Sequence, residues 1–143
     1  MHLFSVATLF AALTLVGVEF SVSAFVNPAA WRLEPGPQLA LLSRLAFVLG
    51  KVMPVWYPAS TLLLAIETWL YWRTPERAIL LTAAVIWGLT ALASILFLVP
   101  LNQRIAEGAP DWQTIHRTWD RRHRVRIAAL ATAAALLAYA LVR

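Results

Sequence analysis

Glu19 and Glu67 are carboxylates that lie within long apolar runs of the sequence. A charged side chain near the centre of a bilayer costs at least about 2.5–3.5 kcal/mol on insertion scales, so it usually has a function there. Their positions place them near opposite membrane faces, too far apart to act as a carboxylate pair. Glu19 is either part of a structural salt bridge to an arginine of the last helix or part of a polar site. For Glu67 we favour an interfacial carboxylate that reaches the outer headgroups beside Trp69 and Trp72.

A denser set of polar side chains precedes the last apolar run. Four of them have the spacing i, i+3, i+4, i+7 and share one face of a predicted helix: His116, Trp119, Asp120 and His123. A solvated basic face is the simpler interpretation for His116 and Arg117. For His123 and Arg126 we favour a functional role, because they lie where the helix enters the membrane. Three more polar residues are expected at the same depth, Glu19, Asn27 and Asn102, so the sequence predicts a convergent polar cluster.

Several kinds of chemistry are excluded or weakly supported. The chain has no cysteine, which excludes disulfides, thiolate nucleophiles and Cys-ligated metals. It also lacks a nucleophile elbow, a Gly-rich phosphate loop and an HExxH motif. His116 and His123 lie two helical turns apart, whereas chelation from one helix generally uses i, i+4 spacing. A metal or haem site would therefore need a ligand from another helix, such as Glu19, and that redox alternative stays open.

Composition identifies the elements that must position these residues. Of 143 residues, 61% are hydrophobic and 13% charged, with a net charge of +5, whereas soluble domains carry about a quarter charged residues. The basic residues gather at the ends of apolar runs, so membrane topology explains the charge and no nucleic-acid partner is expected. We predict one integral membrane domain over residues 1–143, an all-α four-helix transmembrane bundle. Its spans are expected at about 3–26, 54–72, 78–101 and 124–142.

The predicted ends of the spans follow from prolines and aromatic residues. Asn27-Pro28 is expected to end the first span, and Pro100 with Asn102 the third, before a polar connection over 103–114. The first run lacks a basic segment before it and is long for a signal peptide, so we interpret it as a helix. Residues 38–50 form either an interfacial helix or a kinked extension of the second span. From Asp111 or Trp112 onward one helix of about 30 residues, roughly 45 Å long, is expected.

The distribution of Lys and Arg predicts the orientation. The first loop holds three such residues, the second two and the third six. The positive-inside rule then places the first and third loops in the cytoplasm and both termini outside, with the bacterial inner (plasma) membrane as the expected location.

Several segments together resemble a known family. They are Gly17–Phe20, Asn27–Pro28, Val99–Asn102, Trp112 and Trp119–Arg126. In this order they resemble the anthrone oxygenase-like family of small four-span membrane proteins, and the resemblance covers nearly the whole chain. Its most specific part is a Pro-x-Asn segment followed by Trp, Trp, His and Arg, which corresponds to Pro100, Asn102, Trp112, Trp119, His123 and Arg126. After the second tryptophan the family often has Asn where this chain has Asp120.

The resemblance implies oxidation of an anthrone-type tricyclic phenol to its quinone by O₂, without flavin, haem or metal. The residues with implied catalytic roles are His123 as base, Arg126 and Asn102 as donors to the enolate oxygen, and Glu19, which orients His123 or holds Arg126. The residues with implied substrate contacts are Trp112, Trp119 and Asn27.

Two further classes of function stay open at this stage. One is the metal- or haem-binding redox protein described above. The other is a non-enzymatic small membrane subunit or lipid-binding module, whose partner surface would be the alanine-rich face of the last helix. The expected partners are membrane lipids and a hydrophobic aromatic small molecule. Assembly as a homo-oligomer or within a larger membrane complex is a further expectation.

Overall fold

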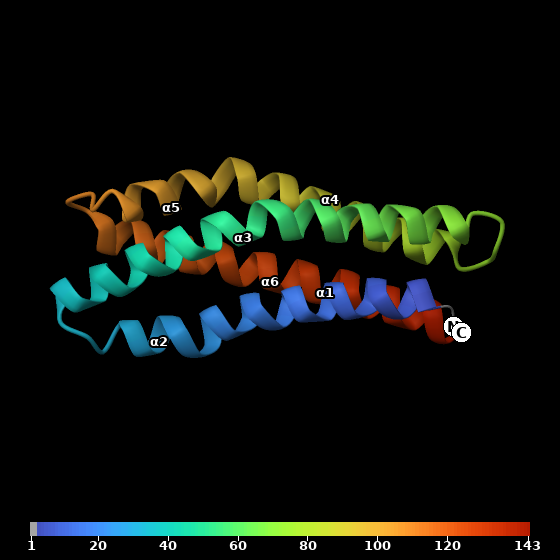
Figure 1. The fold of residues 1–143 in the computed structure, drawn as a ribbon, viewed down its shortest axis with the longest axis horizontal. Coiled ribbons are helices and arrows are strands. Elements are labelled where there is room, and N and C mark those ends of the chain that lie inside the picture. Colours follow the sequence, from blue (N-terminus) through green and yellow to red (C-terminus); the bar gives the residue numbers. More distant parts are fainter. Residues whose placement is uncertain (1–2) are drawn as a thin grey trace.

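The computed structural model describes residues 3–143 as four long helical rods that lie side by side (Figure 1). Each rod is long and apolar enough to cross a membrane, so the chain is an integral membrane protein with an all-α four-helix bundle, as predicted. The rods consist of these elements: α1 (Leu3–Ser21), the π-helical turn η1 (Val22–Val26) and α2 (Asn27–Ala30); α3 (Pro35–Leu70); α4 (Arg77–Phe97) and α5 (Val99–Ala106); and α6 (Trp112–Val142). Both termini lie at one end of the bundle, opposite α2 and α5.

The first and third rods continue past the prolines that were expected to end them. In the first rod, the Asn27 N–H donates to the carbonyl of Val22, five residues back, and this wide turn is followed by α2 with Pro28 in its first turn. In the third rod, the helix breaks at Leu98 and α5 begins with Pro100 in its first turn. Proline is tolerated there because the first helical turn does not use its missing N–H. The predicted connection over 103–114 is therefore helical up to Ala106.

The second rod is a single helix of 36 residues, α3, which contains Pro54 and Pro58. Residues 38–50 are thus an extension of the second span, and the alternative of a separate interfacial helix is wrong. Leu42 of this extension packs with Ile105 of α5 and Trp112 of α6, which holds it against the bundle.

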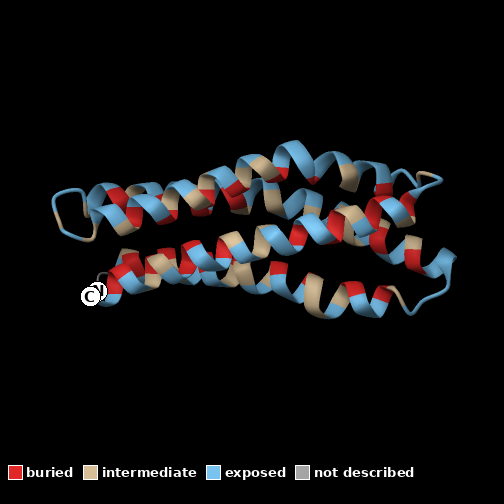
Figure 2. Ribbon diagram, turned by 180° about the vertical axis from the view of Figure 1, so that it is seen from behind, coloured by how far each residue is buried: buried red, intermediate tan, exposed pale blue. Residues whose placement is uncertain are grey.

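The core lies along α6, which contacts both α1 and α4. Buried residues form stripes that face inward on all four rods (Figure 2). The largest buried cluster is made mainly of small and aliphatic side chains around Trp87, among them Ala12, Leu15, Leu80, Leu130, Ala133 and Leu137. Ala133, Ala134 and Ala140 of α6 are therefore buried within the bundle, where small residues allow helices to approach closely. Ala128, Ala131 and Ala135 of the same helix are exposed, so the expected partner surface on α6 stays a prediction.

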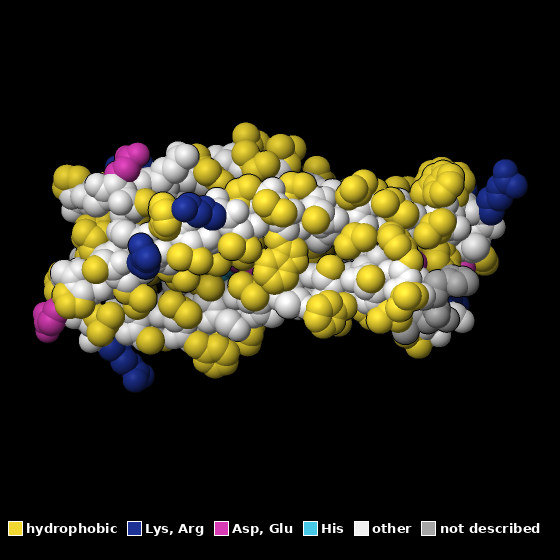
Figure 3. Space-filling view, viewed as in Figure 1, with side chains coloured by type: hydrophobic (Ala, Val, Ile, Leu, Met, Phe, Trp, Pro, Cys, Tyr) yellow, Lys and Arg dark blue, Asp and Glu magenta, His cyan; other side chains and the backbone are white. Residues whose placement is uncertain are grey.

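The outer surface suits a hydrocarbon environment. Large apolar side chains such as Phe10, Leu62, Leu89 and Ile95 are exposed. On the face shown in Figure 3, hydrophobic side chains cover the middle of the bundle, whereas charged ones lie toward its two ends. This arrangement is that expected for helices that span a bilayer.

The buried face of α6 predicts different responses to Ala133→Leu and Ala135→Leu. Ala133 is fully buried, so Leu should overpack the contacts with α1 and α4 and lower the free energy of unfolding by about 1–3 kcal/mol. Ala135, two residues along the same helix, is exposed, and its substitution should have little effect. Denaturant titration in mixed micelles, followed by circular dichroism, measures both. Equal losses for the two variants would contradict the described packing of α6.

Candidate functional site

Glu19 lies at the centre of a buried polar cluster formed by α1, α3 and α6. Its side chain accepts two hydrogen bonds, from the Tyr57 hydroxyl to Oε1 at 2.7 Å and from Arg126 Nη2 to Oε2 at 2.5 Å. Glu19 is 1% exposed, and the Arg126 side chain is 12% exposed. The pair with Arg126 confirms the salt bridge considered for Glu19. It compensates a charge that would otherwise be unpaired in a membrane interior.

His123 is fully buried beside this pair, and both of its ring nitrogens are engaged. Nε2 lies 3.0 Å from the backbone carbonyl of Glu19, and Nδ1 lies 2.8 Å from Arg126 Nη2. A carbonyl only accepts hydrogen bonds, so Nε2 carries the proton and donates a hydrogen bond to the Glu19 carbonyl. Nδ1 accepts a hydrogen bond from the guanidinium of Arg126. The imidazole is therefore the neutral tautomer, and the lone pair expected to act as a base faces Arg126.

The turn η1 follows shortly after Glu19 in the same rod. At η1 the backbone hydrogen bonding of the rod changes to a five-residue spacing. Such π-helical turns occur frequently at functional sites. Here the Glu19 carbonyl, one turn before η1, accepts a hydrogen bond from another helix.

A column of four rings runs from Trp31 to His123. Successive ring centroids are 5.3 Å apart for Trp31 and His116, 5.8 Å for His116 and Trp119, and 4.5 Å for Trp119 and His123. His116 is 2% exposed, so the interpretation of this residue as part of a solvated basic face is wrong. Arg117 is exposed and lies over the Trp31 ring. Stacking against tryptophan, rather than solvation, accommodates His116.

Asn27 is joined to α6 through Asp120 instead of through the Glu19 cluster. Its Nδ2 donates to Asp120 Oδ1 at 2.6 Å, and Arg124 donates to the other carboxylate oxygen, also at 2.6 Å. Asp120 therefore holds α2 against α6. The amide of Asn27 and the carboxylate of Asp120 form a second polar contact on the same helix face.

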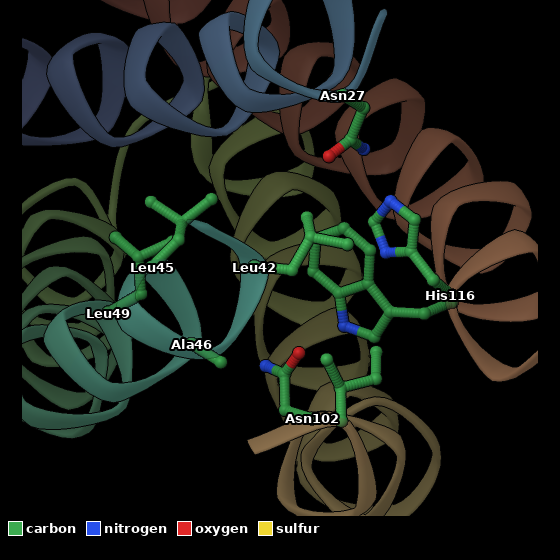
Figure 4. A pocket seen from close by; sticks show the side chains of 9 residues that line it. Asn27, Leu42, Leu45, Ala46, Leu49, Asn102 and His116 are labelled. Atoms are coloured by element: carbon green, nitrogen blue, oxygen red, sulfur yellow. The ribbon is translucent and has the colours of Figure 1, made fainter. Parts of the chain in front are cut away.

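Asn102 and Trp112 lie apart from His123. Trp112 packs in an apolar cluster with Ala30, Leu42 and Ile105. Asn102 lines a small cavity together with Asn27, His116 and Trp119, and Figure 4 shows Asn102 and Asn27 on opposite sides of it. The seven predicted site residues are thus divided among several places. Glu19, His123 and Arg126 contact one another, and Trp119 stacks on His123. Asn27 and Asn102 border the cavity, and Trp112 lies in an apolar cluster.

Glu67 is fully buried, which contradicts the prediction of an interfacial carboxylate. The Ser5 hydroxyl donates to its Oε1 at 2.6 Å, and Thr8 Oγ1 lies 3.3 Å from its Oε2. Ser5 and Thr8 are three residues apart and so share one face of α1. That spacing is the sequence signal that indicates a polar partner for Glu67. The two hydroxyls tie α1 to α3 at the end of the bundle that holds the termini.

A groove between α4 and α6 lies next to the Glu19 cluster. It has a volume of about 520 Å³, and its lining includes Thr90, Ser94, Phe97, Leu98, Arg122 and Arg126. None of the described residues that line the groove is a carboxylate. Arg122 Nη1 donates to the Phe97 carbonyl at 3.1 Å. Arg122 and Arg126 are four residues apart, so one face of α6 brings two cations to a mostly apolar groove.

Tyr57 and the groove were not foreseen from the sequence. Tyr57 follows Trp56 in an apolar segment with aromatic residues at both ends, so only its contact with Glu19 distinguishes it. The i, i+4 spacing of Arg122 and Arg126 indicates that both side chains share one face of α6. The other side of the groove comes from α4, and the sequence does not show that α4 packs there.

Metal binding gains no support from the positions of the donor atoms. Within residues 3–143, no three side chains from His, Asp and Glu converge on a common point. His123 uses both ring nitrogens in hydrogen bonds to Glu19 and Arg126. The redox alternative built on His116, His123 and Glu19 would therefore need these contacts to be broken.

The buried pair predicts strong coupling between Glu19 and Arg126. Arg126→Met leaves the carboxylate with Tyr57 as its remaining side-chain donor, and breaking a buried pair costs about 3–5 kcal/mol of stability. The double variant Glu19→Gln with Arg126→Met removes both charges and should lose much less. Unfolding of all variants in mixed micelles gives the coupling energy. Additive losses in the double variant would show that the two side chains do not interact.

Comparisons with family models, with curated proteins and with solved structures found no match for this chain. The resemblance to the anthrone oxygenase-like family therefore stays a prediction. The Glu19 cluster and the adjoining groove are the features from which a function can be argued.

Proposed function

We propose that this chain is an anthrone oxygenase-like membrane protein that binds a phenolic aromatic molecule from the lipid phase and promotes its oxidation by O₂. The observation that carries the proposal is the groove between α4 and α6, which is mostly apolar, includes two arginines and has no carboxylate in its lining. Such a site favours a hydrophobic molecule with one anionic oxygen.

The size and the free donors of the groove support this ligand class. Its volume of about 520 Å³ is within the range of small-molecule sites, about 300–1,000 Å³, and accommodates a tricyclic aromatic. All hydrogen bonds described for Arg126 use Nη2, and none uses Nη1. The guanidinium therefore has donors left for an oxygen in the groove.

The proposed reaction needs an electron-rich anion rather than a cofactor. Loss of a proton from an anthrone gives an extended enolate, which reduces O₂ by one electron to form superoxide and a carbon radical. These two combine and take up a proton to form a hydroperoxide, and loss of water leaves the quinone carbonyl. Overall, one CH₂ group and one O₂ become one C=O group and one H₂O.

In this proposal the arginines stabilise the enolate oxygen, and the buried cluster positions Arg126. Charge-assisted donors at a developing oxyanion are among the strongest catalytic interactions. His123 is the proposed base, but it is fully buried and does not line the groove, so its Nδ1 accepts the substrate proton only after Arg126 has moved away from it. Before substrate binds, Glu19 holds the guanidinium through Oε2, and the Tyr57 hydroxyl donates to Glu19 Oε1. Of the predicted site residues, Asn27, Asn102, Trp112 and Trp119 do not line the groove and have no assigned substrate contact.

Oxygen uptake with dithranol, a commercial anthrone, tests the proposal in lipid nanodiscs. The wild type should consume one O₂ per dithranol at a rate above that of protein-free nanodiscs. Arg122→Gln should lower kcat/KM about tenfold or more, because a hydrogen bond to a charged group is worth about 1.5–3 kcal/mol. Arg121→Gln is the matched control, because it removes the same charge from an exposed residue that does not line the groove.

The outcomes separate binding from oxidation. Alizarin, a phenolic dye that changes colour on ionisation, should ionise at lower pH when bound to the wild type than when bound to Arg122→Gln. If alizarin responds in this way but dithranol oxidation is not accelerated, the groove binds phenols and the oxidase proposal is wrong. Equal rates for Arg122→Gln and Arg121→Gln would overturn the assignment of the groove as the reaction site.

We also propose that the end of the bundle with α2 and α5 faces the cytoplasm of a bacterial inner membrane, with both termini outside. The uneven distribution of Lys and Arg among the loops supports this orientation.

Because the chain has no cysteine, single-cysteine variants report the orientation directly. Pro75→Cys lies in the loop between α3 and α4, and Glu107→Cys lies in the loop between α5 and α6; both residues are exposed. In intact cells, a membrane-impermeant maleimide should label Pro75→Cys and leave Glu107→Cys unlabelled until the cells are lysed. The opposite pattern would mean that the basic end faces outward.

A further inference from the structure

The small cavity at the α2 and α5 end of the bundle borders three buried polar atoms that have no hydrogen-bond partner among residues 3–143. These atoms are Asn27 Oδ1, His116 Nε2 and Trp119 Nε1. The three residues are 1%, 2% and 5% exposed. Buried polar atoms are nearly always hydrogen-bonded, so three around one cavity indicate a bound polar molecule.

The neighbouring contacts fix how two of these residues face the cavity. Asn27 donates through Nδ2 to Asp120, which leaves its Oδ1 as an acceptor. His116 stacks between Trp31 and Trp119. Figure 4 shows the Asn27 amide and the His116 ring close to one another at the same side of the cavity.

The two irregular rods bring the polar groups together. Asn27 comes directly after the π-helical turn η1, and Asn102 lies in the first turns of α5, after the helix break at Leu98. Both asparagines line the cavity with His116 and Trp119 of α6. The changes of helix register therefore place amides from two rods opposite the ring column of a third.

We propose that this cavity is a hydration site, whose bound water satisfies the unpartnered atoms of Asn27, His116 and Trp119. The donors and acceptors are complementary to water: Trp119 Nε1 donates to it, and Asn27 Oδ1 accepts from it. His116 Nε2 supplies either role according to its tautomer, and the Asn102 amide lines the same cavity. Buried waters typically make about three hydrogen bonds of this kind.

The size and the remaining lining favour water over an organic ligand. About 20 Å³ is open to the centre of a water-sized sphere, whereas one buried water requires about 10–15 Å³ on this measure. The other wall is apolar and comes from Leu42, Leu45 and Ala46 of α3. A water in this cavity joins α2 to α6. It supplies hydrogen bonds to the buried polar atoms, which the apolar side chains of α3 cannot supply. This site is separate from the groove between α4 and α6, so it does not depend on the proposed function.

NMR of the full chain in detergent tests the site, with Trp87 as an internal control. Trp87 Nε1 is also buried without a protein partner, but Trp87 lies in the apolar cluster and does not line the cavity. The Trp119 indole N–H, assigned from the peak that is lost in Trp119→Phe, should show a cross-relaxation peak with water of the sign expected for a long-lived contact. The Trp87 indole N–H should show none. A water peak that is absent for Trp119, or equal for both indoles, would overturn the proposal.

A second measurement uses the sign of a stability change. Ala46→Leu adds volume to the wall of the cavity and should displace the water, which leaves the three polar atoms without a partner. The apparent Tm should then fall by several degrees relative to Ala40→Leu, an exposed position on α3 that does not line the cavity. Filling a dry cavity would instead leave the Tm unchanged or raise it, and either of these results would contradict bound water.

Discussion

The structure depends on how one carboxylate is accommodated inside a membrane. Glu19 has no access to water, so its charge must be compensated by the protein. Tyr57 from α3 and Arg126 from α6 provide this compensation, and His123 donates to the Glu19 backbone. Three of the four rods are therefore joined at a single residue. Because lipid gives little hydrophobic drive for helix association, such polar contacts and close packing of small residues such as Ala133 must hold the bundle together.

The first and third rods each change their helical register before an asparagine that lines the small cavity. A straight α-helix uses every interior carbonyl within its own backbone, and it keeps its side chains in one fixed pattern. The π-helical turn η1 and the break at Leu98 shift that pattern and turn Asn27 and Asn102 toward α6. Pro28 and Pro100 follow these irregularities and occupy first turns, where their missing N–H has no cost. The prolines thus mark the places where the rods redirect their side chains, without ending the helices.

Much of the fold was predictable because membranes constrain sequences strongly. Hydropathy identified the four spans, and the absence of a breaker after Trp112 indicated one long α6, which runs to Val142. The i, i+3, i+4, i+7 face also predicted that His123 and Arg126 approach Glu19. The errors came from effects that local patterns do not contain. Glu67 was misplaced because its hydroxyl partners lie on α1, and the burial of His116 depends on the distant ring of Trp31.

The balance of charge in the Glu19 cluster bears on which anions the groove can accept. Arg126 is already paired with Glu19, and His123 is neutral, so the cluster as a whole carries no net charge. A permanently charged carboxylate or sulfonate would have to leave water for a groove whose one uncompensated cation is the exposed Arg122. A phenol or anthrone can instead enter from the lipid as a neutral molecule and lose its proton after binding. The paired guanidinium therefore favours weak acids that ionise within the groove, and such acids become electron donors to O₂ only after that ionisation.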